Sequence, residues 1–130
     1  MMKEIPIDDL SGTDHPYDAE EVTLRKKLAS FYRLVDKHQW NVGIYQYISV
    51  RVHKKYFLLN PIGPLWSEIT AASLLKFDLN GELIDRGNNS VQALNIGAIR
   101  LLSLVYSKRP EINCLIHIHP RAGVAVRFTP

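Results

Sequence analysis

Two histidines stand one residue apart near the end of the chain, at His117 and His119. The residues around them, from Asn113 to Pro120, are mostly apolar and β-branched, which predicts a buried strand. Because side chains alternate across a strand, both imidazoles point to one face. Zinc sites use neutral imidazoles, usually with three or four protein ligands. The pair therefore predicts half of a metal site; histidines hydrogen-bonded in the core or at a subunit interface are the alternative.

Candidates for a third metal ligand are few. His15 lies in the N-terminal segment, His38 at the end of a predicted helix and His53 at the end of a predicted strand. None has a spacing that marks it as the partner of the pair, so we expect all three at the surface. Cys114, the single cysteine, falls on the opposite face of the strand and is predicted to be a core residue.

The elements that position the pair follow from hydrophobic periodicity and from turn and cap residues. They are a helix over 18–38 capped by Asp18, a half-buried strand over 47–52, a strand over 56–59, a hairpin of 74–78 and 82–85 around Asn80-Gly81, a helix from about 91 or 95 to 108, and a last helix over 122–128. This order predicts an α/β domain with a largely antiparallel central sheet over 18–130, after a loose leader over 1–17.

Composition limits the classes of function. The chain has 130 residues, of which 46% are hydrophobic and 22% charged, which suits one globular domain. It has no apolar run long enough for a membrane span, no signal peptide, and one cysteine, which fits a reducing, cytoplasmic compartment. The net charge of +3 is spread along the chain, with small basic clusters at 25–27 and 54–55, and does not indicate nucleic-acid binding.

From about Leu24 to Val126 the chain resembles the class II aldolase/adducin family, in particular its adducin-like branch. The resemblance rests on pieces that come in order: 28–35 in the first helix, 43–52 in the first strand, 57–74 as the most specific stretch, Tyr106 followed by Arg109-Pro110, and His117-Ile118-His119. Each piece is short, but the ordered set covers most of the chain.

The resemblance implies an α/β/α fold, often in a tetramer with sites between subunits. In the enzymes of the family, zinc held by the positions of His117 and His119 and by a later third histidine polarises the carbonyl of a sugar phosphate. A glutamate then moves the proton during aldol cleavage or epimerisation. For the adducin-like branch, the resemblance implies a non-catalytic assembly module.

This sequence departs from the enzyme pattern at the reacting groups. The catalytic glutamate falls on Ala98, which can neither donate nor accept a proton. The phosphate-binding Gly-Asn, Thr-Gly and Ser-Ser pairs fall on Gln46-Tyr47, Ile62-Gly63 and Ile96-Gly97. Glu68 is a candidate substitute base; alternatively, it is a first-turn glutamate that interacts favourably with a helix dipole.

The ending is a further departure, because the family's third histidine and later strands lie beyond the point at which this chain stops. Missing strands would leave a sheet edge and apolar faces uncovered, so we expect a fragment, a split gene product or a protein that needs a partner to complete its core. Three functions remain open: a zinc-dependent aldolase of weak or absent activity, a non-catalytic assembly module, and an enzyme for a bulkier or unphosphorylated substrate whose base is not identified, with Glu68 as a candidate.

Overall fold

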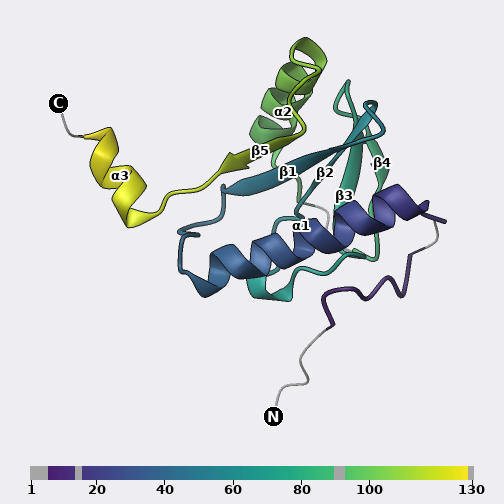
Figure 1. Ribbon diagram of the computed structural model, residues 1–130, viewed down its shortest axis with the longest axis horizontal. Coiled ribbons are helices and arrows are strands. Elements are labelled where there is room, and N and C mark those ends of the chain that lie inside the picture. The colour runs from purple at the N-terminus through teal and green to yellow at the C-terminus, as the bar shows by residue number, and fades with distance from the viewer. Residues whose placement is uncertain (1–5, 14–15, 90–92, 129–130) are drawn as a thin grey trace.

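The computed structural model describes residues 6–13, 16–89 and 93–128 (Figure 1). Their elements, in chain order, are α1 (Ala19–Lys37), β1 (Tyr47–Val52), β2 (Tyr56–Leu59), the 3-10 helix η1 (Trp66–Glu68), β3 (Leu75–Asp78), β4 (Leu83–Asp85), α2 (Ile96–Lys108), β5 (Cys114–His117) and α3 (Arg121–Arg127). The strands form one sheet in the order β4-β3-β2-β1-β5, and each pairing is antiparallel. The predicted largely antiparallel α/β fold is confirmed.

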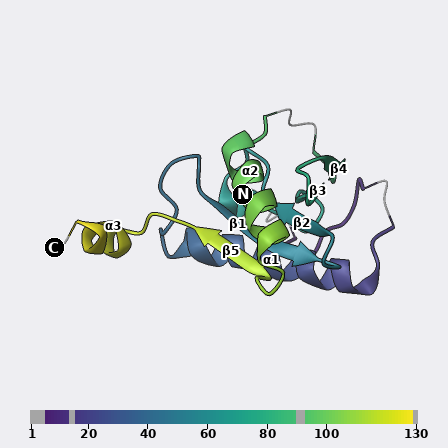
Figure 2. The same ribbon diagram turned by 90° about the horizontal axis from the view of Figure 1, so that it is seen from above.

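The sheet lies between the two long helices, α1 on one face and α2 on the other, as Figures 1 and 2 show. One apolar cluster joins α1 to the face that carries Ile48, Val52 and Leu58. A second joins α2 to the face that carries Tyr47 and Phe57. The predicted α/β/α layering is therefore confirmed, with the core divided between the two sides of the sheet.

Local signals set the limits of the helices. Asp18 precedes α1 and accepts a hydrogen bond from the Glu21 N–H at 2.9 Å, as its prediction as an N-cap requires. Asn95 does the same for α2 by accepting from the Ala98 N–H at 3.0 Å. The earlier of the two predicted starts for that helix, Val91, lies outside the described residues.

Arg25 of α1 is completely buried and binds groups from three parts of the chain. Its guanidinium lies 2.9 Å from the Glu21 carboxylate and 2.9 Å from the Asp85 carboxylate of β4. It also donates to the carbonyl oxygens of Ala71 at 3.1 Å and Leu74 at 2.9 Å. A buried charge needs such partners, so this network fixes α1 against the loop before β3 and the edge strand β4.

The prediction that the 47–52 strand is half-buried is wrong, because α2 covers its polar face. Ser49 is fully buried and lies 3.2 Å from the Tyr106 hydroxyl of α2. Arg51 donates to the carbonyls of Tyr106 at 2.8 Å and Arg109 at 3.1 Å, which satisfies acceptors at the C-terminal end of α2. On the other face, the Tyr32 hydroxyl of α1 accepts from the Ile48 N–H at 3.0 Å.

The described part of the predicted leader contacts the rest of the domain. The Ala71 N–H donates to the Ile7 carbonyl at 2.9 Å, and the Ala72 N–H donates to the Asp9 carbonyl at 3.0 Å. The Tyr17 hydroxyl donates to Asp85 at 2.5 Å and so joins the Arg25 network. The predicted domain boundary after residue 17 stays a prediction, and His15 lies outside the described residues.

The strand that carries His117 is not buried, contrary to the prediction from its apolar sequence. Among the strands of the described residues, β5 is the outermost on the side of β1, with which it pairs. Cys114 is exposed rather than part of the core, and Ile116 is 45% exposed. α3 confirms the predicted last helix, but it buries no residue and stands away from the sheet (Figure 1).

Candidate functional site

The two histidines converge at the end of β5. Their Nε2 atoms lie 3.1 Å apart. His117 pairs with Tyr47 of β1, and the two rings stack with centroids 5.1 Å apart and an interplanar angle of 15°. His119 lies beyond the strand, where its backbone N–H donates to the Oε1 of Gln46 at 3.1 Å. Gln46, just before β1, and Tyr47, its first residue, therefore contact the two histidines.

The separation of the two nitrogens fits one edge of a zinc coordination sphere. With zinc–nitrogen bonds of about 2.0–2.1 Å, nitrogens 3.1 Å apart subtend an angle of about 100° at the metal, near the tetrahedral value. Both side chains are exposed, so their positions do not fit the alternative of histidines buried in the core. The pair is thus a geometrically suitable half-site.

The environment of His117 favours the form that binds metals. Partial burial, in part beneath the Tyr47 ring, lowers the pKa of His117, and the positive charge of a protonated His119 lowers that pKa further. Metal binding requires an unprotonated imidazole. At neutral pH His117 is therefore available as a ligand and does not repel a cation.

A third ligand is not in place within the described residues, where no three His, Cys, Asp or Glu side chains are arranged to hold a metal ion. His38 stacks on Trp40 at the end of α1, with ring centroids 5.0 Å apart. The nitrogens of His53 lie 2.7 Å and 3.2 Å from the carboxylates of Asp18 and Glu20, at the start of α1. Both histidines have partners within the fold.

Glu68 and the histidine pair belong to different sides of the sheet. η1, which contains Glu68, packs against α1, whereas His117 stacks on Tyr47 in the layer of α2. The Glu68 carboxylate is exposed and accepts from the Leu65 N–H at 2.8 Å, so it caps its own short helix. The structure therefore does not bring Glu68 to the pair.

The first turn of α2 presents an apolar surface to the sheet. Ala98, its third residue, is 4% exposed and packs in the cluster that also contains Tyr47. The side chain that stacks on His117 is thus a phenol ring, and the third residue of α2, in the same cluster, contributes a methyl group. Burial raises the pKa of Tyr47, so its phenol is protonated at neutral pH and does not act as a base.

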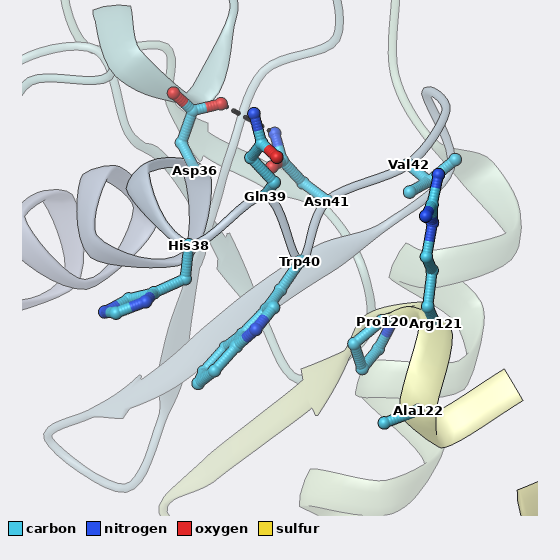
Figure 3. Close-up of a pocket in the computed structure, with 9 residues that line it drawn as sticks. All are labelled: Asp36, His38, Gln39, Trp40, Asn41, Val42, Pro120, Arg121 and Ala122. Atoms are coloured by element: carbon cyan, nitrogen blue, oxygen red, sulfur yellow. Dashed lines mark hydrogen bonds between the residues drawn. The ribbon is translucent and has the colours of Figure 1, made fainter. Parts of the chain in front are cut away.

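A groove of about 740 Å³ lies beside the pair and was missed by sequence reasoning. Figure 3 shows residues from the end of α1 and the loop to β1 facing the start of α3; the lining residues are Asp36, His38, Gln39, Trp40, Asn41, Val42, Pro120, Arg121 and Ala122. The Asn41 amide donates to Asp36 at 2.8 Å and shapes the loop. Neither histidine of the pair lines this groove. The feature of the sequence that could have indicated the groove is Trp40, an aromatic residue among polar ones.

Comparison with known proteins assigns the fold to a family. The family model of the Class II Aldolase and Adducin N-terminal domain matches residues 26–129. The chain belongs to this family. It is 45% identical over 124 residues to alpha-adducin of Mus musculus, covering 93% of the chain and 17% of that protein. It is 40% identical to Adducin-related protein 1 of Caenorhabditis elegans, covering 94% of the chain and 17% of that protein.

Solved structures place this class II aldolase/adducin domain among proteins about twice as long. An aldolase II superfamily protein from Pseudomonas syringae is 33% identical, with a TM-score of 0.76, and covers 85% of the chain and 44% of its own length. L-fuculose 1-phosphate aldolase from Glaciozyma antarctica shares the fold at 23% identity and a TM-score of 0.75, covering 89% and 49%. The chain thus spans less than half of these structures and about a sixth of the adducins.

Within the class II aldolase/adducin fold, two of the predicted departures fall in the same part of the core. Ala98 stands where the resemblance predicts the catalytic glutamate, and Tyr47 stands where it predicts a phosphate-binding asparagine; the two share one apolar cluster. Gln46 is buried and uses its side chain to hold His119 and the Val42 carbonyl. In the part of the chain that the structure describes, no helix is long and apolar enough to cross a membrane.

Proposed function

We propose that this class II aldolase/adducin domain is a non-catalytic assembly module, and that His117 and His119 are the remaining part of a zinc site. The observation that supports this proposal is that Tyr47, which stacks on His117, and Ala98 belong to one apolar cluster. The identity of 45% to alpha-adducin supports the adducin-like side of the family. We further expect a cytoplasmic protein that forms homo-oligomers.

Aldol chemistry needs a base within hydrogen-bond reach of the proton that it removes. A methyl group at Ala98 and a protonated phenol at Tyr47 do not supply one, and Glu68 caps η1. A sugar phosphate bound beside His117 would therefore have no acid–base group of the usual kind to remove its proton. Catalysis by the family mechanism is therefore expected to be absent or very weak.

Turnover assays test the proposal directly. Purified protein supplied with zinc and a panel of sugar phosphates, including L-fuculose 1-phosphate, should cleave none of them faster than zinc in buffer does. An L-fuculose 1-phosphate aldolase assayed in parallel shows that the conditions support cleavage. Robust retro-aldol activity would overturn the proposal, and its loss in Glu68→Gln would favour the alternative, an enzyme that uses Glu68 as its base.

Zinc binding by the pair is a separate expectation. When bound, zinc polarises a carbonyl oxygen, and His117 and His119 would hold it through their convergent Nε2 atoms. The wild type should bind zinc weakly, because two protein ligands are fewer than structural or catalytic sites use. The variant His117→Ala/His119→Ala should lose this binding, whereas His38→Ala should keep it. Equal zinc in the double variant and the wild type, measured by titration calorimetry, would exclude the pair as the site.

A further inference from the structure

The pairing between β1 and β5 ends before it reaches His119. Hydrogen-bonded and non-hydrogen-bonded residue pairs alternate along an antiparallel ladder. The Arg51 N–H donates to the Asn113 carbonyl at 2.8 Å, so the bonded series continues at steps of two and includes the last pair, 47 with 117. The next step would pair His119 with Tyr45, but β1 begins at residue 47 and β5 ends at residue 117. Main-chain pairing thus stops one step short of the second histidine.

The side chain of Gln46 supplies the acceptor that the next pair of the ladder would have provided. Its Oε1 accepts from the His119 N–H at 3.1 Å. Its Nε2 donates to the Val42 carbonyl, in the loop before β1. Gln46 is only 2% exposed, and a buried carboxamide is costly unless its donor and its acceptor both have partners. These two bonds therefore fix which end of the carboxamide faces His119.

The hydrogen bond to Gln46 determines where the His119 imidazole lies. Residues two positions apart share a face only where the chain continues along the strand direction. The bond ties the main chain at His119 to the side of β1, and the Nε2 atoms of the two histidines then lie 3.1 Å apart. His117 is held separately, by its pairing with Tyr47 and by the stack of the two rings. The spacing of the pair therefore depends on the Gln46 side chain.

We propose that Gln46 is a positioning residue for the histidine pair: its carboxamide keeps His119 in line with His117, so that the two imidazoles are preorganised to bind one zinc ion. The inference rests on the zinc binding proposed above and names the residue that sets the geometry of that site. A preorganised pair loses less conformational freedom on binding than two independently moving side chains. Removing a group that orients metal ligands typically lowers metal affinity by about 10- to 100-fold.

Nuclear magnetic resonance of the metal-free protein tests the positioning itself. In the wild type, the ring protons of His117 and His119 should show a nuclear Overhauser effect, because the two rings are in contact. Gln46→Met keeps the length of the side chain but removes the amide, so this effect should be lost and the His119 amide proton should exchange faster with solvent. Gln46→Leu replaces Gln46→Met if the methionine variant does not fold.

Asn60→Leu is the matched control. Asn60 is also a buried carboxamide, but it accepts from the Tyr32 hydroxyl at 2.8 Å, in the layer of α1. Its replacement should lower the stability of the fold and leave the contact between the two imidazoles unchanged. A contact that survives in Gln46→Met, or that is lost equally in Asn60→Leu, would overturn the inference.

Titration calorimetry with zinc then tests the consequence for metal binding. Gln46→Met should bind zinc about tenfold more weakly than the wild type, or weaker still, whereas Asn60→Leu should bind it equally well. Equal zinc affinity in Gln46→Met and the wild type would contradict the positioning role. A wild type that binds no zinc, but whose imidazole contact depends on Gln46, separates the two ideas: the zinc proposal then fails, and the arrangement of the pair by Gln46 is confirmed.

Discussion

Replacing Arg25 with methionine is expected to lower the free energy of unfolding by about 3–5 kcal/mol, one of the two largest losses predicted for a single side chain. The substitution keeps much of the side-chain volume but removes the cation between the Glu21 and Asp85 carboxylates. It also removes the donor to the Ala71 and Leu74 carbonyls. Buried acceptors without a donor are destabilising, and the loss should appear in urea unfolding.

Lys27→Met is the matched control for this prediction, since Lys27 lies on an exposed face of the same helix. It should change the unfolding free energy by less than about 0.5 kcal/mol. Combining Arg25→Met with Asp85→Leu should cost less than the sum of the two single changes, because the double variant no longer buries the Asp85 charge. Equal losses for Arg25→Met and Lys27→Met would show that the network does not stabilise the fold.

Gly87→Ala is expected to cost about 3–5 kcal/mol, from backbone strain and a steric clash together. Gly87 has a φ of +59°, in the left-handed region that disfavours a side chain. A Cβ atom there would lie 2.0 Å from the Ala72 carbonyl oxygen and 3.0 Å from that of Leu74. Because these oxygens belong to the backbone that also binds Arg25 and Asn88, the clash cannot be relieved by a rotamer change.

The substitution Gly43→Ala separates backbone strain from steric clash as causes of the stability loss in Gly87→Ala. Gly43 has a φ of +88°, but a Cβ atom there would meet no atom within 4 Å. Its substitution should therefore cost only the backbone strain, about 1–2 kcal/mol. Thermal and urea unfolding of both variants measure the difference. A loss for Gly87→Ala no greater than that for Gly43→Ala would mean that the loop around Ala72 adapts freely.

The parts of the fold that sequence predicted are those set by local chemistry. Asp18 and the Asn80-Gly81 turn fix the start of α1 and the β3–β4 hairpin through contacts a few residues away. The burial of Ser49 and Arg51 was not predictable in the same way, because their partners lie more than fifty residues further along the chain. Hydrophobicity also predicted burial for β5, since composition does not show whether a strand is central or at an edge.

In the candidate site, too, the features set by local sequence were predictable and those set by distant contacts were not. The period of two in a strand predicted that His117 and His119 converge, and their nitrogens do. The stack of His117 on Tyr47 depends on the register between β1 and β5, which the sequence does not specify. The groove at Trp40 was missed because it forms where the loop before β1 faces the start of α3, two segments that lie far apart in the sequence.

Hydrogen bonds from β1 to both helices limit how far α1 and α2 can move along the sheet when core side chains change. Apolar packing is non-directional and would let a helix slide along the sheet. The Tyr32 hydroxyl holds α1 to Ile48 by a directional hydrogen bond. Arg51 holds the C-terminal end of α2 by hydrogen bonds to the carbonyls of Tyr106 and Arg109. Because both helices are bonded to one strand, we expect exchanges of core side chains to shift either helix little along the sheet. Arg51 of β1 therefore fixes the C-terminal end of α2, the helix whose first turn carries Ala98.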